Sequence, residues 1–145
     1  MENKCGECTL CCTLFPIKEI NKPINTECVY CDKGCMIWDT KPEECTKFNC
    51  AYLQSSAGIN LRPDRCGIIF EKVSERLFFG TVAPNRKPSE YALQQITNFN
   101  NQGYSVILSS LDTVYNRLFL ADIHNELEIQ AEFSKYLEKY GNLCN

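Results

Sequence analysis

Residues 5–12, which read CGECTLCC, decide how the first part of this chain folds. Two-residue gaps separate the first three cysteines, and such gaps let a tight turn bring successive sulfurs to one metal ion or one cluster. The fourth cysteine directly follows the third, and adjacent side chains diverge in almost any backbone conformation. We therefore expect Cys11 and Cys12 to serve different centres, or one of them not to be a ligand.

A second cysteine-rich stretch, residues 28–35, reads CVYCDKGC and is followed by Cys45 and Cys50. It repeats the two-residue gap, and Gly34 can adopt the left-handed conformation that presents the next cysteine. Cys45 and Cys50 are five residues apart, which corresponds to about 140° around an ideal helix. If both bind one centre, a helix that carries them must bend or end near Asn49.

The clustered cysteines outnumber the ligands of a single tetrahedral site. Nine thiols are enough for two four-thiolate sites with one sulfur left over, or for one site plus structural thiols. The alternative is a set of free thiols or disulfides in a small core, but such cysteines would not repeat the two-residue gap three times. The candidate metal ligands are Cys5, Cys8, Cys11, Cys12, Cys28, Cys31, Cys35, Cys45 and Cys50. Cys66 and Cys144 lie outside the clusters and are expected to be ordinary thiols.

The available donors limit the metal to zinc or an iron-sulfur cluster. The only histidine, His124, is remote in sequence and expected on a helix surface, so the sites should be all-thiolate. Both Zn²⁺ and a [4Fe-4S] cluster accept four thiolates, and the C-x2-C-x2-C run slightly favours the cluster. Either would add folding free energy on the order of 10 kcal/mol or more, which would compensate for a thin apolar core.

Composition and charge restrict the compartment and the partners. The amino terminus has no apolar run behind its first lysine, so we expect no secretory signal and a cytoplasmic location. In a reducing compartment clustered cysteines are more often metal ligands than disulfides, and the odd total of eleven fits full pairing poorly. The net charge of -3 is spread evenly, so no basic face is expected for nucleic acid or an anionic membrane. The apolar runs are strand-sized and too short to span a bilayer.

The chain divides by composition into two parts. At 145 residues it has the length of one compact domain, and cysteine-rich sequence gives way to ordinary globular sequence between Ser55 and Leu61. We expect a metal-stapled, cysteine-rich lobe of short helices and loops over residues 1–57, followed by residues 58–145. The fold class is α+β, and the second lobe should contain a small antiparallel or mixed sheet with two helices.

Local patterns predict the elements of both lobes. In the first, Thr40-Lys41-Pro42-Glu43 indicates a helix over residues 41–53 with the threonine as its cap. The second should contain a hairpin at 67–73 and 76–82, a helix over 88–101 capped by Ser89, strands at 104–108 and 113–120, and a helix over 123–139. The two helices are expected to pack through Tyr91, Leu93, Ile96 and Phe99, and through Leu127, Ile129, Phe133 and Leu137.

The cysteine pattern resembles that of the YkgJ-like family of zinc- or iron-chelating proteins, which is known by a CxxCxxCC signature. The similarity rests on residues 5–12, on Cys28, on residues 34–45, which read GCMIWDTKPEEC, and on residues 48–50, which read FNC. It covers about the first third of the chain, and residues 61–66, LRPDRC, also resemble some members. The resemblance implies metal chelation by the motif cysteines.

The chain departs from the family pattern in its central segment. Where the family carries a tyrosine and an arginine, this chain has Trp38 and Lys41. Lysine lacks the planar fork with which arginine makes two parallel hydrogen bonds. A clamping role for that arginine is therefore not expected here.

Three classes of function fit the sequence. The first is a non-enzymatic metal-binding protein whose second lobe offers a surface to a protein partner or a larger assembly. The second is an iron-sulfur redox carrier or metal-delivery protein. An enzyme comes last, because the chain has no P-loop, no Gly-x-Ser-x-Gly motif and one histidine, and no catalytic residue is predicted. An enzyme would need a cavity beside the cysteines.

Overall fold

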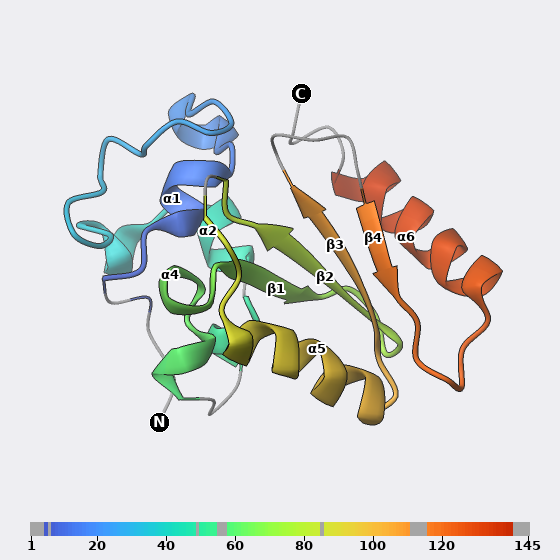
Figure 1. The fold of residues 1–145 in the computed structure, drawn as a ribbon. Helices are drawn as coiled ribbons and strands as arrows, with labels where there is room; N and C mark the ends of the chain where they lie inside the picture. The colour runs from blue at the N-terminus through green and yellow to red at the C-terminus, as the bar shows by residue number, and fades with distance from the viewer. Residues whose placement is uncertain are drawn as a thin grey trace.

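The fold is α+β, with short helices and loops at one end of a four-stranded mixed sheet (Figure 1). The computed structural model describes residues 5, 7–48, 50–54, 58–84, 86–110 and 116–140. The predicted fold class and the predicted mixed sheet are therefore confirmed. Within these residues no helix is long and apolar enough to cross a membrane.

The strands lie side by side in chain order. They are β1 (Ile68–Lys72), β2 (Leu77–Val82), β3 (Ser105–Ser110) and β4 (Asn116–Phe119). The predicted hairpin is β1 and β2, whose antiparallel register pairs Ile69 with Thr81 and Glu71 with Phe79. The helix α5 (Glu90–Asn101) connects β2 to the parallel strand β3, and β4 returns antiparallel. The first residues of the strand predicted at 113–120 lie outside the described residues.

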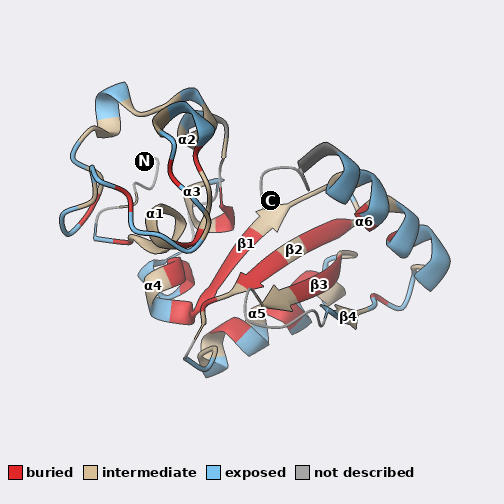
Figure 2. Cartoon of the chain, turned by 90° about the horizontal axis from the view of Figure 1, so that it is seen from above, coloured by how far each residue is buried: buried red, intermediate tan, exposed pale blue. Residues whose placement is uncertain are grey.

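Alternation along the strands gives the sheet two apolar faces. One face packs on α5, where the rings of Phe78 and Phe99 stack with centroids 4.2 Å apart. The other face packs at one end on α6 (Glu126–Tyr140) through Leu77, and at the opposite end on the cysteine-rich segment through Ile69. Figure 2 shows α5 on one side of the sheet and both the cysteine-rich segment and α6 on the other.

Short elements make up the cysteine-rich segment. They are α1 (Leu10–Leu14), η1 (Lys18–Ile20), η2 (Trp38–Thr40), α2 (Glu43–Lys47) and α3 (Ala51–Gln54). Two more, η3 (Ile59–Leu61) and α4 (Pro63–Cys66), lead into β1, and Gly67 ends α4 with a left-handed φ of 83°. Few apolar side chains other than cysteines are buried before residue 55, and they are Leu14, Ile17 and Ala51.

The helix predicted over residues 41–53 is wrong as a single element. The backbone is extended at Phe48, with φ −83° and ψ 118°, and this residue ends α2. The second half becomes the separate helix α3. The interruption between α2 and α3 consequently separates Cys45 from Cys50, and the spacing of an ideal helix does not apply to them.

A distant carboxylate begins α2 instead of the predicted cap Thr40, which lies in η2. The Glu19 side chain accepts hydrogen bonds from the backbone N–H groups of Glu43 and Glu44, both at 3.1 Å. The Glu44 carboxylate in turn accepts from the Glu19 N–H at 3.1 Å. This reciprocal pair satisfies the free N–H groups at the start of the helix and ties α2 to η1.

The two longer helices have their predicted positions but not all of their predicted faces. The Ser89 hydroxyl caps α5 as predicted and accepts from the Ala92 N–H at 3.0 Å. Leu93 is 51% exposed, because Ala92 and not Leu93 faces the sheet together with Ile96 and Phe99. The prediction for Leu93 is therefore wrong.

The apolar face of α6 is narrower than the sequence predicts. Ile129 and Phe133 are buried and Tyr136 packs beside them. Leu127 and Leu137 are 80% and 44% exposed, so the predictions for these two residues are wrong. The face that meets the sheet follows the i, i+4, i+7 spacing from Ile129, and Leu127 falls on the other side of the helix.

Polar contacts hold α6 against the turn between β1 and β2. Arg76 Nε donates to Glu132 Oε1 at 2.7 Å, and the Ser74 hydroxyl donates to Glu132 Oε2 at 2.6 Å. Arg76 Nη1 also donates to Glu128 at 3.0 Å. These contacts fix the distance between α6 and the sheet.

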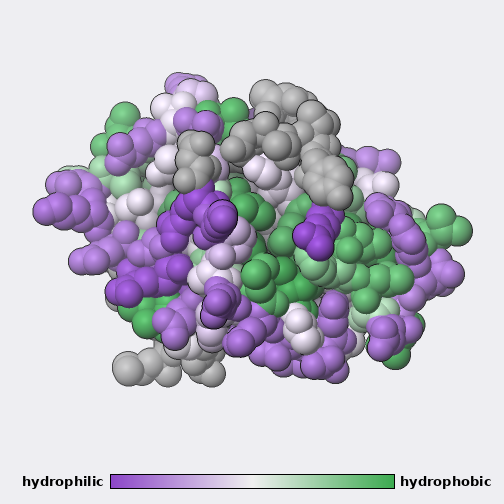
Figure 3. Space-filling view, in the orientation of Figure 1, coloured by the Kyte–Doolittle hydropathy of each residue, from purple (hydrophilic) through white to green (hydrophobic). Residues whose placement is uncertain are grey.

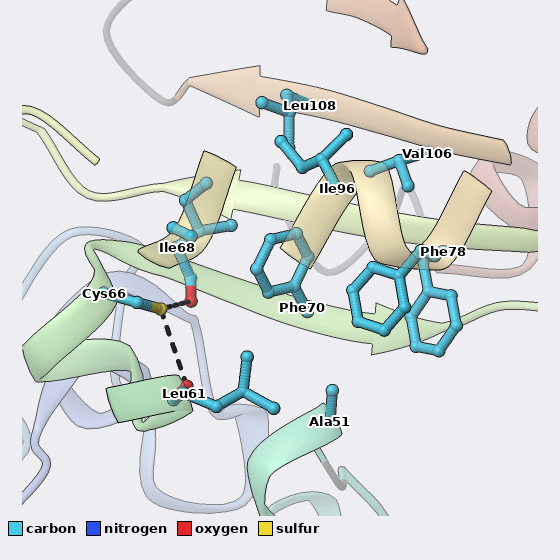
Figure 4. Close-up of a cluster of buried hydrophobic side chains, with 11 residues drawn as sticks. Ala51, Leu61, Cys66, Ile68, Phe70, Phe78, Ile96, Val106 and Leu108 are labelled. Atoms are coloured by element: carbon cyan, nitrogen blue, oxygen red, sulfur yellow. Dashed lines mark hydrogen bonds between the residues drawn. The ribbon is translucent and has the colours of Figure 1, made fainter. Parts of the chain in front are cut away.

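The two predicted lobes share one apolar core. Ala51 from the first and Leu61 from the second pack into the cluster that includes Phe70 and Phe78 (Figure 4). Cys66 is fully buried in the same cluster, and its thiol donates to the carbonyls of Leu61 at 3.5 Å and Ile68 at 3.1 Å. The cysteine-rich segment is thus packed on the sheet.

Candidate metal centre

All nine clustered cysteines are described, and each is a free thiol. α1 carries Cys11 and Cys12, α2 carries Cys45, and Cys50 directly precedes α3. The Cys28 N–H donates to the Cys12 carbonyl at 2.9 Å, which brings the second cysteine stretch alongside the first. The fold therefore gathers residues that are up to 45 positions apart in the sequence.

Four thiols form a first group, Cys5, Cys8, Cys11 and Cys50. Neighbouring thiols raise one another's pKa because two thiolates at short range repel. Burial, and then Cys50 and Cys8, raise the pKa of Cys5 to about 12, and Cys35 makes a smaller contribution. Burial raises the pKa of Cys11 well above its ordinary value, with further contributions from Cys50, Cys8 and Cys5. Burial also raises the pKa of Cys8 to about 11, and Cys50 adds to the shift.

Five thiols form a second group, Cys12, Cys28, Cys31, Cys35 and Cys45. Burial raises the pKa of Cys12 to about 12, and Cys31, Cys28, Cys35 and Cys45 all contribute. Burial, followed by Cys28 and Cys35, raises the pKa of Cys45. The loop that carries three of them is closed by a Cys31 N–H bond to the Cys28 carbonyl at 3.0 Å and by a bridge between Cys31 and Cys35.

The neighbours Cys11 and Cys12 belong to different groups. Cys11 interacts most strongly with the other members of the first group, and Cys12 with those of the second. Successive residues on a helix point about 100° apart, which accounts for the divergence. The two groups therefore adjoin at Cys11 and Cys12 in α1.

Backbone amides are directed at several of the sulfurs. The Tyr30 N–H lies 3.4 Å from the Cys28 sulfur. Although burial raises the pKa of Cys50, the N–H groups of Leu53 and Tyr52 at the start of α3 oppose that shift. Amides in these positions stabilise a thiolate more than a neutral thiol.

Two lysines, Lys22 and Lys41, place positive charge near the thiols, and neither was predicted to do so. Lys22 is only 6% exposed, and its ammonium donates to the carbonyls of Phe15 and Pro23. Burial lowers the pKa of Lys22, while ionised Cys28 and Cys12 would raise it. No sequence signal identifies Lys22, because lysine is usually exposed.

Lys41 and Trp38, the two departures from the family pattern, contact each other. The Lys41 ammonium lies 3.6 Å from the centroid of the Trp38 ring, which is a cation–π arrangement. Burial raises the pKa of Cys5 and of Cys45, and Lys41 counteracts the shift in both. Lys41 therefore serves as a counter-charge close to both thiol groups.

The thiols are gathered but not arranged as a closed metal site. Among the described residues, no three or more Cys, His, Asp or Glu side chains are positioned to hold a metal ion. The prediction that His124 lies on a helix surface is wrong. It precedes α6, and its Nδ1 is 2.8 Å from the hydroxyl of Ser105, which is fully buried.

A cavity of about 610 Å³ lies beside the thiols. Seven of the described cysteines line one end, and the face of the sheet next to α6 lines the other. The enzyme hypothesis requires a cavity in this position, so its presence leaves that hypothesis open. A cavity of this volume is in the range of small-molecule sites.

The fold and the site thus define a mixed α+β protein with a thiol-rich segment beside a cavity. No protein-family model, no curated protein and no solved structure matches the chain. The function is therefore inferred from the site itself.

Proposed function

We propose that the protein binds metal through one or two all-cysteine centres, and that the metal mainly stabilises residues 5–54. The gathering of nine thiols into two adjoining groups carries this proposal. The first centre would draw on Cys5, Cys8, Cys11 and Cys50. The second would draw four ligands from Cys12, Cys28, Cys31, Cys35 and Cys45. Zn²⁺ and a [4Fe-4S] cluster both fit four thiolates, and the spacing of the first three cysteines slightly favours the cluster.

The chemistry of the donors supports metal binding over a purely structural use of the thiols. Bound cysteines must be thiolates, and the raised pKa values mean that the metal-free groups hold their protons. Two lysines and several backbone amides stabilise negative charge at these sulfurs. A zinc ion would hold its four sulfurs at about 2.3 Å.

Elemental analysis with an absorption spectrum tests the proposal directly. The protein should be purified without oxygen and without a metal-binding affinity tag. Zinc without visible absorbance would indicate structural zinc, whereas iron with acid-labile sulfide and a broad visible band would indicate a cluster. Protein that holds neither metal, and that takes up neither on reconstitution, would contradict the proposal.

Single substitutions test the division into two groups. Cys50→Ser should remove the metal of the first centre and leave the second, and Cys45→Ser should do the reverse. Cys66→Ser is the matched control, because the Cys66 thiol belongs to the sheet core and donates to two carbonyls there, so its loss should leave the metal content unchanged. Equal loss of metal in all three variants would contradict the division.

A redox or metal-delivery role is the second candidate. It is favoured by exposed apolar side chains around the second group, where Val29 and Met36 are 81% and 67% exposed. Apolar side chains beside a partly exposed centre suit transient docking of a protein partner. A reversible redox titration of the purified protein distinguishes a carrier from a structural centre. We propose a cytoplasmic location for the protein and, from its cysteine motif, membership of the YkgJ-like family.

A further inference from the structure

We propose that the cavity is a binding site for a small organic cation with an apolar body, whose ammonium group pairs with the Glu71 carboxylate. This inference goes beyond metal binding. The cavity lies between the cysteine-rich segment and α6, on the sheet face opposite α5. Glu71 and Thr81, from neighbouring strands, form part of its floor.

Aromatic side chains form walls on both sides of the cavity. On the α6 side, the Phe79 ring lies 5.3 Å from that of Phe133 and 5.4 Å from that of Tyr136. On the cysteine side, Phe15 and Phe48 meet edge to face at 5.2 Å. Such walls bury the apolar body of a ligand, and aromatic faces also attract cations.

The charged side chains that line the cavity are Glu71 on the sheet floor and Lys41 and Glu44 in the cysteine-rich segment, and Glu71 is the one that we assign to the ligand. Burial raises the pKa of Glu71. The Tyr136 hydroxyl, which donates to Oε2 at 2.7 Å, lowers the pKa but offsets only part of this shift. No ion pair of the described residues includes Glu71. A half-buried carboxylate with one neutral donor is poorly compensated, and a cation that enters the cavity would supply the missing charge.

On the face seen in Figure 3, apolar side chains gather over the strands, whereas hydrophilic side chains predominate over the cysteine-rich segment. Glu132, a carboxylate of α6, is by contrast already paired with Arg76. The cavity therefore has aromatic walls and, in Glu71, a carboxylate without a cationic partner among the described residues.

Calorimetric titration of the full-length protein as purified without oxygen tests the site. The probes are phenylethylammonium and phenylbutylammonium, and each has the alcohol of the same length as its neutral counterpart. We expect saturable binding of the ammonium probes, at least about tenfold tighter than that of the alcohols, as for a hydrogen bond to a charged group. The fluorescence of Trp38, the only tryptophan and a residue of the cavity wall, should change with the same midpoint.

Two matched variants assign the effect to Glu71. Glu71→Gln keeps an acceptor for Tyr136 and should abolish the preference for ammonium. Glu75→Gln makes the same change in net charge at a side chain that is 90% exposed, and it should bind like the unmodified protein. Equal binding of ammonium and alcohol, no saturable binding, or equal effects of the two variants would each overturn the proposal. The metal content of the same samples is measured separately, so loss of metal binding and loss of cation binding remain distinguishable.

Discussion

In the folded chain, burial favours the protonated form of Cys5, Cys8 and Cys12. The ordinary thiol pKa of 9.0 is raised to about 12 at Cys5 and Cys12 and to about 11 at Cys8. Above pH 9 the unfolded chain therefore holds fewer protons than the folded chain. By linkage, the stability of the metal-free protein should fall as the pH rises from about 9 towards 12.

Urea unfolding of reduced, metal-free protein at about pH 8 and about pH 10 measures this loss. We expect a lower midpoint at the higher pH. Lysines and tyrosines also titrate in this range, so the control is a variant with serine at Cys5, Cys8 and Cys12. Its midpoint should fall less between the two pH values. An equal fall in both proteins would show that these thiols do not cause the effect.

Metal binding should have the opposite pH dependence. The ion displaces protons from the thiols, so acid competes with the metal and affinity should rise with pH up to the thiol pKa values.

Individual residues also show what sequence can predict. Repeated spacing identified the nine cysteines, but Glu71 and Lys22 acquire their properties only from the fold, which buries a carboxylate in one case and an ammonium in the other.

At the scale of elements, the start of α2 depends on a residue 24 positions earlier in the chain. Glu19→Ala removes the acceptor for the N–H groups of Glu43 and Glu44, and should lower the free energy of unfolding by about 1 kcal/mol, the usual contribution of a helix cap. Thr40→Ala is the matched control, because Thr40 is the cap that the sequence suggests. Urea unfolding of the metal-loaded protein compares the two. A larger loss for the Thr40 variant would contradict the assignment of Glu19.

The elements that the sequence predicts well are those with local signals. Strand alternation and the Ser89 cap identify the hairpin and α5, because both patterns are complete within a few residues. The helix over 41–53 fails because the extended backbone at Phe48 is set by tertiary packing, where its ring meets that of Phe15. The prediction for α6 fails because Leu127 lies on the other side of the helix from Ile129, and because Leu137 lines the cavity and stays 44% exposed.

At the scale of the whole molecule, the sheet and the cysteine-rich segment have different sources of stability. The sheet has an aromatic and aliphatic core on both faces. Among the described residues before residue 55 the buried apolar side chains are few, and three hydrogen bonds of that region involve the buried Lys22 or the Cys28 sulfur instead. The segment should therefore depend on metal more than the sheet does.

Removal of the metal tests this difference by hydrogen exchange. After chelation, backbone amides in residues 7–48 should lose protection, whereas those of β2 and β3 should keep most of theirs, because their core contains no proposed ligand. Cys66→Ser protein gives the reference for damage to the sheet core, since Cys66 lies in that core. Simultaneous loss of protection in the segment and in β2 and β3 would mean that the contacts of Ala51 and Cys50 with the sheet make folding a single cooperative step. Loss of protection in the segment alone would instead show that the cysteine-rich side of the cavity depends on the metal for its structure. Chelation should then also weaken cation binding at Glu71.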